Sequence, residues 1–409
     1  MRIYANLIIN YYFCINFCAM VERQIKNSLK HYLEKFPVVL LTGPRQSGKS
    51  TLLKHSFPDY DYVSLEEPDI RLLAETDPRG FLANYPRETI IDEAQYVPQL
   101  FSYIQSITDK ENSVGRFILS GSQNFLLMQS ITQSLAGRAA ILKLLPFSYS
   151  ELNNASLAPE TINKSLFTGG YPRIYDKQIL PNEFYPNYIQ TYVERDVRLL
   201  RNITDISLFI RFVKLCAGRI GQILNIASLA NECGINVITA NAWLSVLETS
   251  YIAFQLKPYH NNYNKRLVKS PKLYFYDTGL ACSLLGIENE NQLQTHYFRG
   301  ELFENWIISE CLKNSYAVGK EPSIYFWRDS NGVEIDLLIE KGGELSAIEI
   351  KSGSTMNTDF FKNLLLWQKF SAMPNDNLTV VYGGEQSYQT KNGKFLSWKE
   401  WTSQNSDVK

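Results

Sequence analysis

LLTGPRQSGKSTLL, residues 40–53, decides the fold of the N-terminal part of this chain. An apolar run leads into a loop that begins at Gly43 and ends at Gly48-Lys49-Ser50, and a helix-compatible segment follows. A loop of the form GxxxxGK[ST] between a strand and a helix is typical of phosphate binding. Its glycines let successive backbone N–H groups surround a phosphate, and the helix N-terminus adds its positive dipole end. The stretch therefore predicts a nucleotide site, against the alternative of a chance glycine loop.

Each part of this loop has an expected task. We expect Lys49 to act as a catalytic charge that reaches the β- and γ-phosphates, and Ser50 to offer its hydroxyl to Mg²⁺. The other residues present backbone groups to the phosphates. The predicted nucleotide-binding residues of the loop and the helix start are Gly43, Pro44, Arg45, Gln46, Ser47, Gly48, Lys49, Ser50 and Thr51.

An acidic strand end supports this interpretation. TIIDEAQ, residues 89–95, is an apolar run that ends in two carboxylates. We expect Asp92 to bind the hydration shell of the Mg²⁺ and the nucleotide site, and Glu93 to polarise the attacking water. A strand that ends in Asp-Glu is common by itself, but it is a strong signal when it follows a phosphate-binding loop.

Two further segments offer polar groups to the same site. FILSGSQ, residues 117–123, ends in Ser120, Ser122 and Gln123, which either sense the γ-phosphate or only cap the strand end. Ser122 is counted among the nucleotide-binding residues. Arg138, in QSLAGRAA, precedes another apolar run. Its guanidinium either stabilises transition-state charge, in its own subunit or in a neighbour's, or pairs with a surface acid.

The bulk composition bounds the class of protein. With 409 residues the chain should hold two or three domains. From Pro37 to Leu145 short apolar runs alternate with amphipathic stretches, which predicts an α/β domain with a parallel sheet. Lys plus Arg and Asp plus Glu both number 41, so the whole chain has no charge that would attract nucleic acid or an anionic membrane. Any nucleic-acid contact must come from a local patch.

The N-terminal residues and the cysteines bear on the compartment. Residues 1–19 are apolar and aromatic, which fits a short signal peptide, an extension or a misassigned start. Three asparagines interrupt this run, so it is a poor membrane span, and no membrane partner is expected. The six cysteines are dispersed and form no CxxC pair, which favours a reducing cytoplasm over a disulfide framework or a zinc site.

The region from Asn225 predicts a small helical module. Two helix-patterned segments, NIASLANEC and VITANAWLSVLE, flank residues 234–236, and two strand-like runs surround KPYHNNYNKRLVKSPK. This order resembles a winged helix, whose basic wing would bind DNA phosphates. The predicted nucleic-acid contacts are Lys265, Arg266 and Lys269, with Lys272 beside them. Winged helices also bind proteins, so DNA and a protein partner both stay open.

A β-hairpin is predicted over GVEIDLLIEKGGELSAIEIKSG, residues 332–353. Two strand-patterned runs flank a two-residue Gly-Gly loop, which is a favoured hairpin connection. Lys341 then faces Glu344, and the same register places Asp336 opposite Glu349. Alternation is expected to put the charged residues on one face and the apolar residues on the other. The charged set is Glu334, Asp336, Glu349 and Lys351, and the apolar set is Ile335, Leu337, Ile348 and Ile350.

Opposed carboxylates repel, so this hairpin needs a compensating charge. Mg²⁺ or Mn²⁺ between Asp336 and Glu349 would provide it, because oxygen-only ligation suits these ions. Lys351 would then act as a catalytic group that positions a water or stabilises phosphoryl charge. The alternative is a solvated ladder of charges on an edge hairpin.

The motifs together resemble a known family. LTGPRQSGKSTLL, TIIDEAQ, FILSGSQ and SLAGR, followed by PFSYSEL and GGYPR, look like the prokaryotic AAA-type ATPases with a C-terminal domain of unknown function. KRLVKSPKLYFYDTGL, GELFENWIISECL and FWRDSNGVEIDLLIE look like the later part of that family. The resemblance covers nearly everything after Met20 and implies ATP as the nucleotide.

The resemblance also implies a fold for the C-terminal part. The D…ExK arrangement resembles the PD-(D/E)xK phosphodiesterase core, although Asp336 here follows Ile335 and not proline. Glu304 matches the position where that superfamily often adds another metal-binding acid. We therefore expect an α/β fold class: a P-loop NTPase parallel sheet, a winged helix and a restriction-endonuclease-like domain. The expected boundaries are 1–19 for the leader, 20–204 for the ATPase, 205–290 for the winged helix and 291–409 for the last domain.

Three functional classes follow. The first is an Mg²⁺-dependent ATPase coupled to a DNA-interacting, nuclease-like module. The second is a nucleotide-switched protein whose nuclease fold is inactive and which passes a conformational change to a partner. The third is a regulatory ATPase that self-associates, where Arg138 completes a neighbour's site. Stimulation of ATP turnover by duplex DNA would favour the first class.

Overall fold

The structure is a computed structural model that describes residues 21–122, 134–192, 203, 205–259, 268–371, 374 and 377–404. The predictions made for residues 1–19, for Gln123, and for Lys265 and Arg266 lie outside the described residues.

The N-terminal part is built on a parallel sheet of β1 to β5. Its strands stand in the order β2-β3-β4-β1-β5, and all four pairings are parallel. Parallel pairing brings the carboxyl ends of the strands to one edge, where the predicted polar residues follow. The predicted parallel sheet is confirmed. The strands are β1 (Val38–Thr42), β2 (Asp61–Ser64), β3 (Thr89–Asp92), β4 (Phe117–Gly121) and β5 (Ala139–Lys143).

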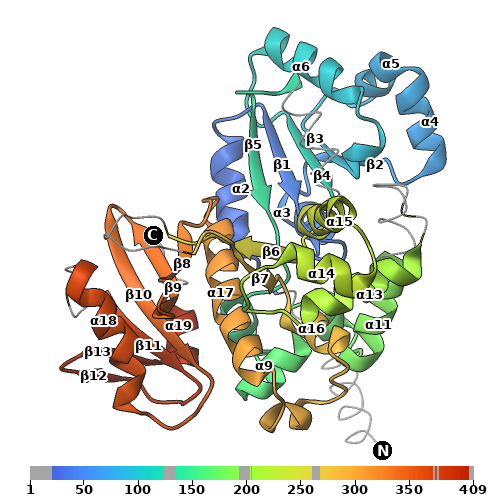
Figure 1. Cartoon of the computed structure of the whole chain (residues 1–409). Helices are drawn as coiled ribbons and strands as arrows, with labels where there is room; N and C mark the ends of the chain where they lie inside the picture. Colours follow the sequence, from blue (N-terminus) through green and yellow to red (C-terminus); the bar gives the residue numbers. More distant parts are fainter. Residues whose placement is uncertain are drawn as a thin grey trace, which may run out of the picture.

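Helices cover both faces of this sheet (Figure 1). Val39 and Leu41 of β1 pack toward α2 and α3, whereas Val38 and Leu40 pack toward α4, α5 and α6. Strand β1 is buried on both sides because it lies inside the sheet, which explains its continuous apolar sequence. The helices are α2 (Ile25–Leu33), α3 (Lys49–Ser56), α4 (Pro68–Thr76), α5 (Pro78–Ala83) and α6 (Leu100–Glu111). A short 3₁₀ turn, η1 (Ala94–Tyr96), follows β3.

The middle part of the chain is mostly helical. Helix α8 begins with a capping box in which Ser148 and Glu151 satisfy each other's backbone N–H groups. The helices before the strand pair are α8 (Tyr149–Asn154), α9 (Ile162–Thr168), α10 (Pro172–Asp176), α11 (Pro181–Tyr192), α13 (Ile206–Ala217), α14 (Ile226–Cys233) and α15 (Val237–Thr249). The antiparallel strands β6 (Ala253–Leu256) and β7 (Lys272–Phe275) follow, and then α16 (Thr278–Leu284) and η3 (Glu290–Gln294).

The two short helices and the strand pair lie where the sequence predicts them. Gly234 ends α14 with φ 80°, a left-handed conformation that glycine adopts without strain. The connection between β6 and β7 includes residues 260–267, which are outside the described part. The winged-helix assignment of this region stays a prediction.

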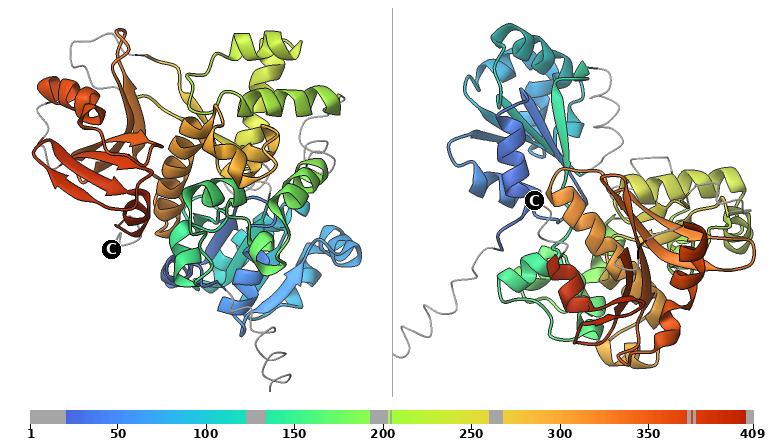
Figure 2. Two further views of the ribbon diagram at one scale, coloured as in Figure 1. Left: turned by 90° about the horizontal axis from the view of Figure 1, so that it is seen from below. Right: turned by 90° about the vertical axis from the view of Figure 1, so that its left-hand side faces the viewer.

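The C-terminal part is a mixed sheet, in the order β12-β13-β11-β10-β9-β8, beside the middle part (Figures 1 and 2). Helix α18 and the turn η4 pack on one face, and α17 and α19 pack on the other. The α/β character is confirmed, and the restriction-endonuclease-like assignment stays a prediction. The elements are α17 (Arg299–Ala317), β8 (Ile324–Arg328), β9 (Glu334–Lys341), β10 (Glu344–Lys351), η4 (Thr358–Phe361), α18 (Lys362–Ser371), β11 (Leu378–Tyr382), β12 (Tyr388–Thr390), β13 (Gly393–Ser397) and α19 (Trp398–Gln404).

The β9–β10 hairpin has the predicted register. Lys341 pairs with Glu344 across Gly342 and Gly343, whose φ values are 63° and 85°. The pairing continues to Leu337 opposite Ile348.

The prediction that the four apolar residues share one face is wrong. Leu337, Ile348 and Ile350 pack with α17 and α19, but Ile335 packs with Trp327 in the cluster on the opposite face. The register of β8 against β9 shifts between Tyr325 and Trp327, and such a bulge breaks the two-residue alternation.

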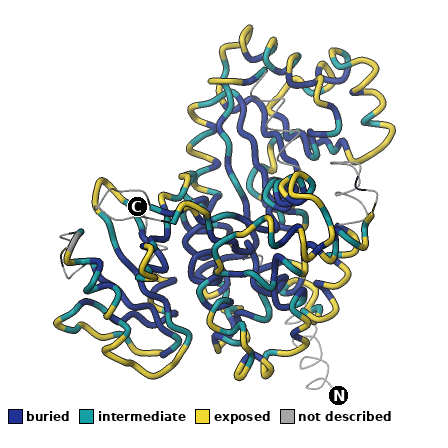
Figure 3. Tube along the Cα trace, viewed as in Figure 1, coloured by how far each residue is buried: buried dark blue, intermediate teal, exposed yellow. Residues whose placement is uncertain are grey.

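Helix α17 joins the three parts of the molecule. Most of its side chains are buried, and it packs against α2 and β5, against α9 and α16, and against β10. A helix that is buried on nearly every side belongs to a core rather than to a surface. Figure 3 shows the burial along these packed elements. One continuous apolar cluster therefore links residues of α8 to α11 with α17 and α19.

Candidate functional site

The glycine-rich loop leaves the carboxyl end of β1 and has the backbone of a phosphate cradle. Gly43 has φ 152°, and a Cβ there would lie 2.0 Å from the backbone oxygen of Leu144. Gly48 has φ 91°, and Gln46 has φ 60°. These conformations curl the loop, and the close contact at Gly43 explains why a glycine is needed there.

Lys49 is the first residue of α3, and its side chain is buried over the loop. Its Nζ donates hydrogen bonds to the backbone oxygens of Gly43, at 3.0 Å, and Pro44, at 2.8 Å. The ammonium therefore lies among the backbone groups that the sequence assigns to the phosphates.

Ser50 and Asp92 are direct neighbours. The Ser50 Oγ donates to Asp92 Oδ2 at 2.6 Å, and the Tyr62 hydroxyl donates to the same oxygen at 2.6 Å. Ser120 Oγ donates to the other carboxylate oxygen. Burial and the hydrogen bond to Asp92 raise the pKa of Tyr62. The carboxylate is thus held on both oxygens by hydroxyls from α3, β2 and β4.

Glu93 follows with a left-handed backbone, at φ 55° and ψ 42°. Its Oε2 accepts hydrogen bonds from Gln95 Nε2 and, at 3.3 Å, from Ser122 Oγ. A non-glycine residue in this conformation costs about 1 kcal/mol or more and concentrates at functional sites. Ser122 therefore contacts the residue that the sequence assigns to water activation.

A cavity of about 800 Å³ opens beside the loop. One wall carries loop and helix residues, among them Arg45, Lys49 and Ser50, and Glu93 lies in it as well. The other wall comes from the N-terminal segment and from the chain between β5 and α11. It includes Val21, Glu22, Arg23, Phe147, Leu157, Pro172, Arg173, Tyr175 and Asp176. The second wall mixes apolar side chains with the charged side chains of Glu22, Arg23, Arg173 and Asp176, so the cavity combines charged groups with apolar surface, as ligand sites usually do.

Arg23 fixes the loop to the opposite wall. Its guanidinium donates to the backbone oxygens of Ser47, at 2.8 Å, and Leu145, at 2.6 Å, and pairs with Glu151 at 3.0 Å. The side chains of Arg23 and Glu151 are 8% and 5% exposed. Because the buried Arg23 guanidinium makes several hydrogen bonds in a fixed geometry, it connects the loop rigidly to the opposite wall.

Arg138 lies away from this cavity. It precedes β5, at the edge of the sheet opposite to the loop, and pairs with Asp109 through two hydrogen bonds of 2.5 and 3.1 Å. The hydrogen bonds that Arg138 donates to Asp109 raise the pKa of Arg138. A catalytic role in its own subunit does not fit this position, and a role in a neighbour's site stays a prediction.

The predicted C-terminal charges do converge. Lys272 Nζ lies 2.9 Å from Glu304 Oε1 and 2.5 Å from Glu334 Oε1. Lys351 Nζ lies 2.6 Å from Glu349 Oε1 and 3.7 Å from Asp336 Oδ2.

Burial perturbs these groups. It raises the pKa of Glu304 to about 7 and that of Glu349 to about 8, and repulsion from Asp336 adds to both shifts. Burial opposes the charge of Lys351, but the carboxylates of Asp336 and Glu349 nevertheless raise its pKa. The cluster is therefore partly buried and is not the solvated ladder of the alternative interpretation.

In the basic patch predicted for the middle part, Lys272 does not lie where a nucleic-acid contact would. This side chain is 3% exposed and is paired with Glu304 and Glu334, so it is not a phosphate contact. Lys269 is exposed, as a nucleic-acid contact requires.

Relatives of the chain span nearly its whole length. Two proteins, from Mycobacterium bovis and Mycobacterium tuberculosis and both described as uncharacterized, are 30% identical to it over 377 residues. This match covers 91% of the chain and 82% of each relative. The chain belongs to their family. An uncharacterized protein of Haemophilus influenzae is 21% identical over 89% of the chain and 98% of its own length.

Family matches along the chain divide it into three ranges. Residues 35–153 match the AAA domain, and residues 159–291 and 299–401 match two domains of unknown function, DUF8612 and DUF4143. A Walker-type ATPase of Pyrococcus abyssi is similar over 64% of the chain and 94% of its own length, with 15% identity and a TM-score of 0.43. The AAA match and the loop geometry together support an ATP-binding ATPase of the AAA type.

The AAA domain has residues that fit Mg²⁺. A hydroxyl and a carboxylate, Ser50 and Asp92, lie together at the carboxyl edge of the sheet, and oxygen ligands of these kinds suit this ion. The C-terminal cluster does not fit a divalent ion, because lysine ammonium groups already lie between its carboxylates. Across the described ranges, three or more His, Cys, Asp or Glu side chains nowhere converge as metal ligands would.

Some residues of the AAA site carry no signal in the sequence. Tyr62 and Arg23 reach Asp92 and the loop from other segments. Arg173 also lines the cavity, from α10. For Arg173 a signal does exist, since it ends GGYPR, one of the motifs of the resemblance.

Among the described residues, none of the helices has the length and the apolar character that a membrane span requires.

Proposed function

We propose that this protein is an Mg²⁺-dependent ATPase that passes its nucleotide state from the AAA domain to the middle and C-terminal parts. The observation that carries this proposal is the composition of the cavity. The loop and α3 bring Arg45, Lys49 and Ser50 to the cavity, and the segment between β5 and α11 brings Phe147 and Leu157 together with Arg173 and Asp176. A nucleotide that fills the cavity would contact both sides at once.

The residues of the cavity have separate tasks in this proposal. Lys49, Arg45 and Arg173 supply positive charge for the phosphates, and Phe147 and Leu157 offer apolar surface to the adenine. Ser50 and Asp92 hold Mg²⁺, which neutralises phosphate charge when it is bound. Glu93, held by Gln95 and Ser122, orients and polarises the attacking water.

The test is ATP binding and turnover of the Lys49→Ala variant. We expect turnover to fall by at least about 100-fold, because the backbone cradle supplies geometry but not this charge. Lys110→Ala is the matched control, since Lys110 is exposed at the end of α6 and does not line the cavity. Normal turnover of Lys49→Ala would overturn the proposal.

A second candidate is that DNA is the partner that receives the nucleotide signal. A cavity of about 710 Å³ between the middle part and β8 is lined by Lys257 and Lys269 and by the rings of Tyr259 and Tyr325, whose centroids are 5.4 Å apart. Ammonium groups beside aromatic rings are typical of single-strand contacts, although Glu248 in the same cavity opposes them. The test is ATP turnover with and without duplex or single-stranded DNA, and unchanged turnover would contradict a DNA partner.

A further inference from the structure

Lys272 enters the carboxylate cluster from a different part of the chain than its partners. It belongs to β7, whereas Glu304 belongs to α17 and Glu334 to β9. Its Nζ contacts both carboxylates, at 2.9 and 2.5 Å, and its side chain is 3% exposed. Glu304 is also one of the acids to which the resemblance to a nuclease core would give a metal ion, together with Asp336 and Glu349.

We infer that the Lys272 ammonium takes the place of a divalent cation in this cluster, which makes it a metal-free ion lock that fixes β7 to α17 and the β9–β10 hairpin. The inference concerns the C-terminal cluster alone and does not depend on ATP hydrolysis.

The charges of the cluster are nearly balanced without a metal. The carboxylates are Glu304, Glu334, Asp336 and Glu349, and the cations that contact them are Lys272, Lys351 and Arg328. An ammonium and a divalent ion repel each other, so the buried Lys272 ammonium opposes the entry of a divalent ion between Glu304 and Glu334.

Several oxygen atoms of the cluster also accept hydrogen bonds from the protein's own donors. Glu304 accepts from the Tyr274 hydroxyl as well as from Lys272, and Asp336 Oδ2 accepts from the Ile350 N–H at 2.8 Å. Among the cluster's carboxylate oxygens, Glu349 Oε2 is buried and has no hydrogen-bond partner. Mg²⁺ requires near-octahedral oxygen ligands at about 2.0–2.1 Å, and the oxygens that accept from Lys272, Lys351 and the Ile350 N–H already have these donors.

The Lys272 ion pairs lie at an interface between the middle and C-terminal parts that backbone hydrogen bonds also join. Strand β8 pairs with the segment that follows β6 through two backbone hydrogen bonds. Tyr259 N–H donates to Phe326 O at 2.7 Å, and Phe326 N–H donates to Lys257 O at 3.1 Å. The side chain of Lys272, on β7, packs beside this connection, and its ammonium lies 5.6 Å from the centroid of the Phe326 ring. Removing the ammonium should therefore loosen the junction of the middle and C-terminal parts.

The experiment compares Mn²⁺ binding by calorimetry in the nucleotide-free full chain, using wild type and Glu349→Gln. We expect no saturable binding that the substitution removes. This comparison does not depend on any Lys272 variant. One Mn²⁺ bound by wild type and lost in Glu349→Gln would overturn the inference, whatever the ATPase activity is.

The second measurement is thermal unfolding of Lys272→Met. Loss of the ammonium leaves Glu304 and Glu334 uncompensated, so we expect the unfolding temperature to fall by about 5 °C or more. Added Mn²⁺ should bind this variant and raise its unfolding temperature, while leaving wild type unchanged. The double variant Lys272→Met/Glu304→Gln, which removes both partners, should recover part of the loss. The inference would be contradicted if Lys272→Met unfolded at the same temperature as the wild type, or if Mn²⁺ did not change the unfolding temperature of this variant.

Discussion

Glu93 is the residue whose geometry makes the most specific kinetic prediction. The Glu93→Gln substitution keeps the side-chain length and an oxygen that Gln95 and Ser122 can still bind, but it removes the negative charge. We expect the Kd for ATP to stay within about threefold and kcat to fall by about 100-fold, because a base acts only in the chemical step. The measurements are nucleotide binding by calorimetry and steady-state phosphate release.

The matched control is Glu88→Gln. Glu88 is exposed and lies just before β3, at the opposite end of the strand from Glu93. It should leave both constants unchanged. Equal loss of binding and turnover in Glu93→Gln would show that Glu93 shapes the site rather than activates water.

The sequence predicts part of this site because the needed signals are local. Lys49, Ser50, Asp92 and Glu93 each follow an apolar strand, and a parallel sheet brings such strand ends to one edge. Arg23 gives no such signal, since its partner Glu151 is 128 positions away. Contacts of this kind depend on tertiary packing, which a strand or helix pattern does not contain.

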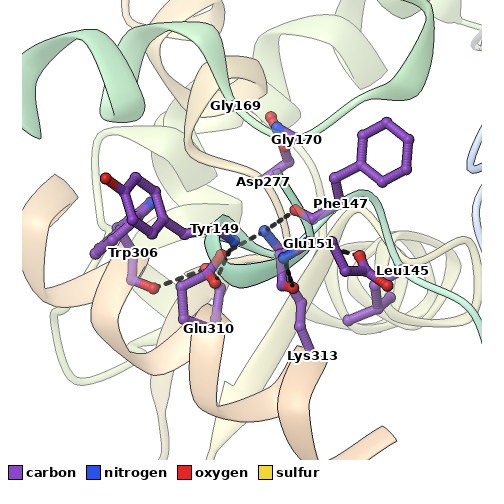
Figure 4. Close-up of polar contacts among 12 residues, drawn as sticks. Leu145, Phe147, Tyr149, Glu151, Gly169, Gly170, Asp277, Trp306, Glu310 and Lys313 are labelled. Atoms are coloured by element: carbon purple, nitrogen blue, oxygen red, sulfur yellow. Dashed lines mark hydrogen bonds and ion pairs between the residues drawn. The ribbon is translucent and has the colours of Figure 1, made fainter. Parts of the chain in front are cut away.

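Helix α17 carries a buried ion pair that is specific to its packing against the segment before α8. Glu310 and Lys313 are 2.8 Å apart, Lys313 donates to Phe147 O at 2.9 Å, and Glu310 accepts from Tyr149 N–H at 2.8 Å (Figure 4). Glu310→Ala would leave Lys313 buried without its counter-charge and Tyr149 N–H without an acceptor. We expect a loss of about 3–5 kcal/mol in the free energy of unfolding, measured by urea denaturation.

Two controls separate the pair from general packing. Replacing both residues by methionine should restore most of the stability, because neither charge is then left alone. Asp109→Ala breaks the exposed pair with Arg138 and should have a much smaller effect. If Glu310→Ala were as mild as Asp109→Ala, the buried pair would contribute little to the packing of α17.

At the scale of elements, the register that a turn sets is more predictable than the face of the sheet on which a side chain lies. The Gly342-Gly343 turn fixes the register of β9 and β10, and this register is confirmed. The side on which Ile335 lies depends on the bulge against β8, a strand that the hairpin sequence does not contain. The compensating charge at Asp336 and Glu349 was expected from a metal, and the structure places the Lys351 ammonium of β10 beside them. Lys272 of β7 pairs with Glu304 and Glu334, a contact that charge patterning within one hairpin does not show.

At the scale of the whole molecule, a buried hydrogen bond just before the phosphate loop begins connects this loop to the middle part. Thr42 Oγ1 and the Tyr251 hydroxyl are 2.6 Å apart, and Thr42 is the last residue of β1. Tyr251 lies between α15 and β6, and its ring packs 5.8 Å from that of Tyr276. A nucleotide that tightens the loop would therefore tighten the start of β6 as well.

We predict that Tyr251→Phe separates nucleotide binding from this response. Binding of a non-hydrolysable ATP analogue should slow amide hydrogen exchange in β6 of the wild type, and the variant should lose at least about half of that slowing. Its affinity for the analogue should change by less than about threefold, because the hydroxyl does not line the cavity. Tyr276→Phe is the control, since it removes a neighbouring hydroxyl that is not bonded to Thr42. Unchanged protection of β6 in Tyr251→Phe would show that the coupling runs through other contacts, of which the Arg23–Glu151 pair is the strongest alternative.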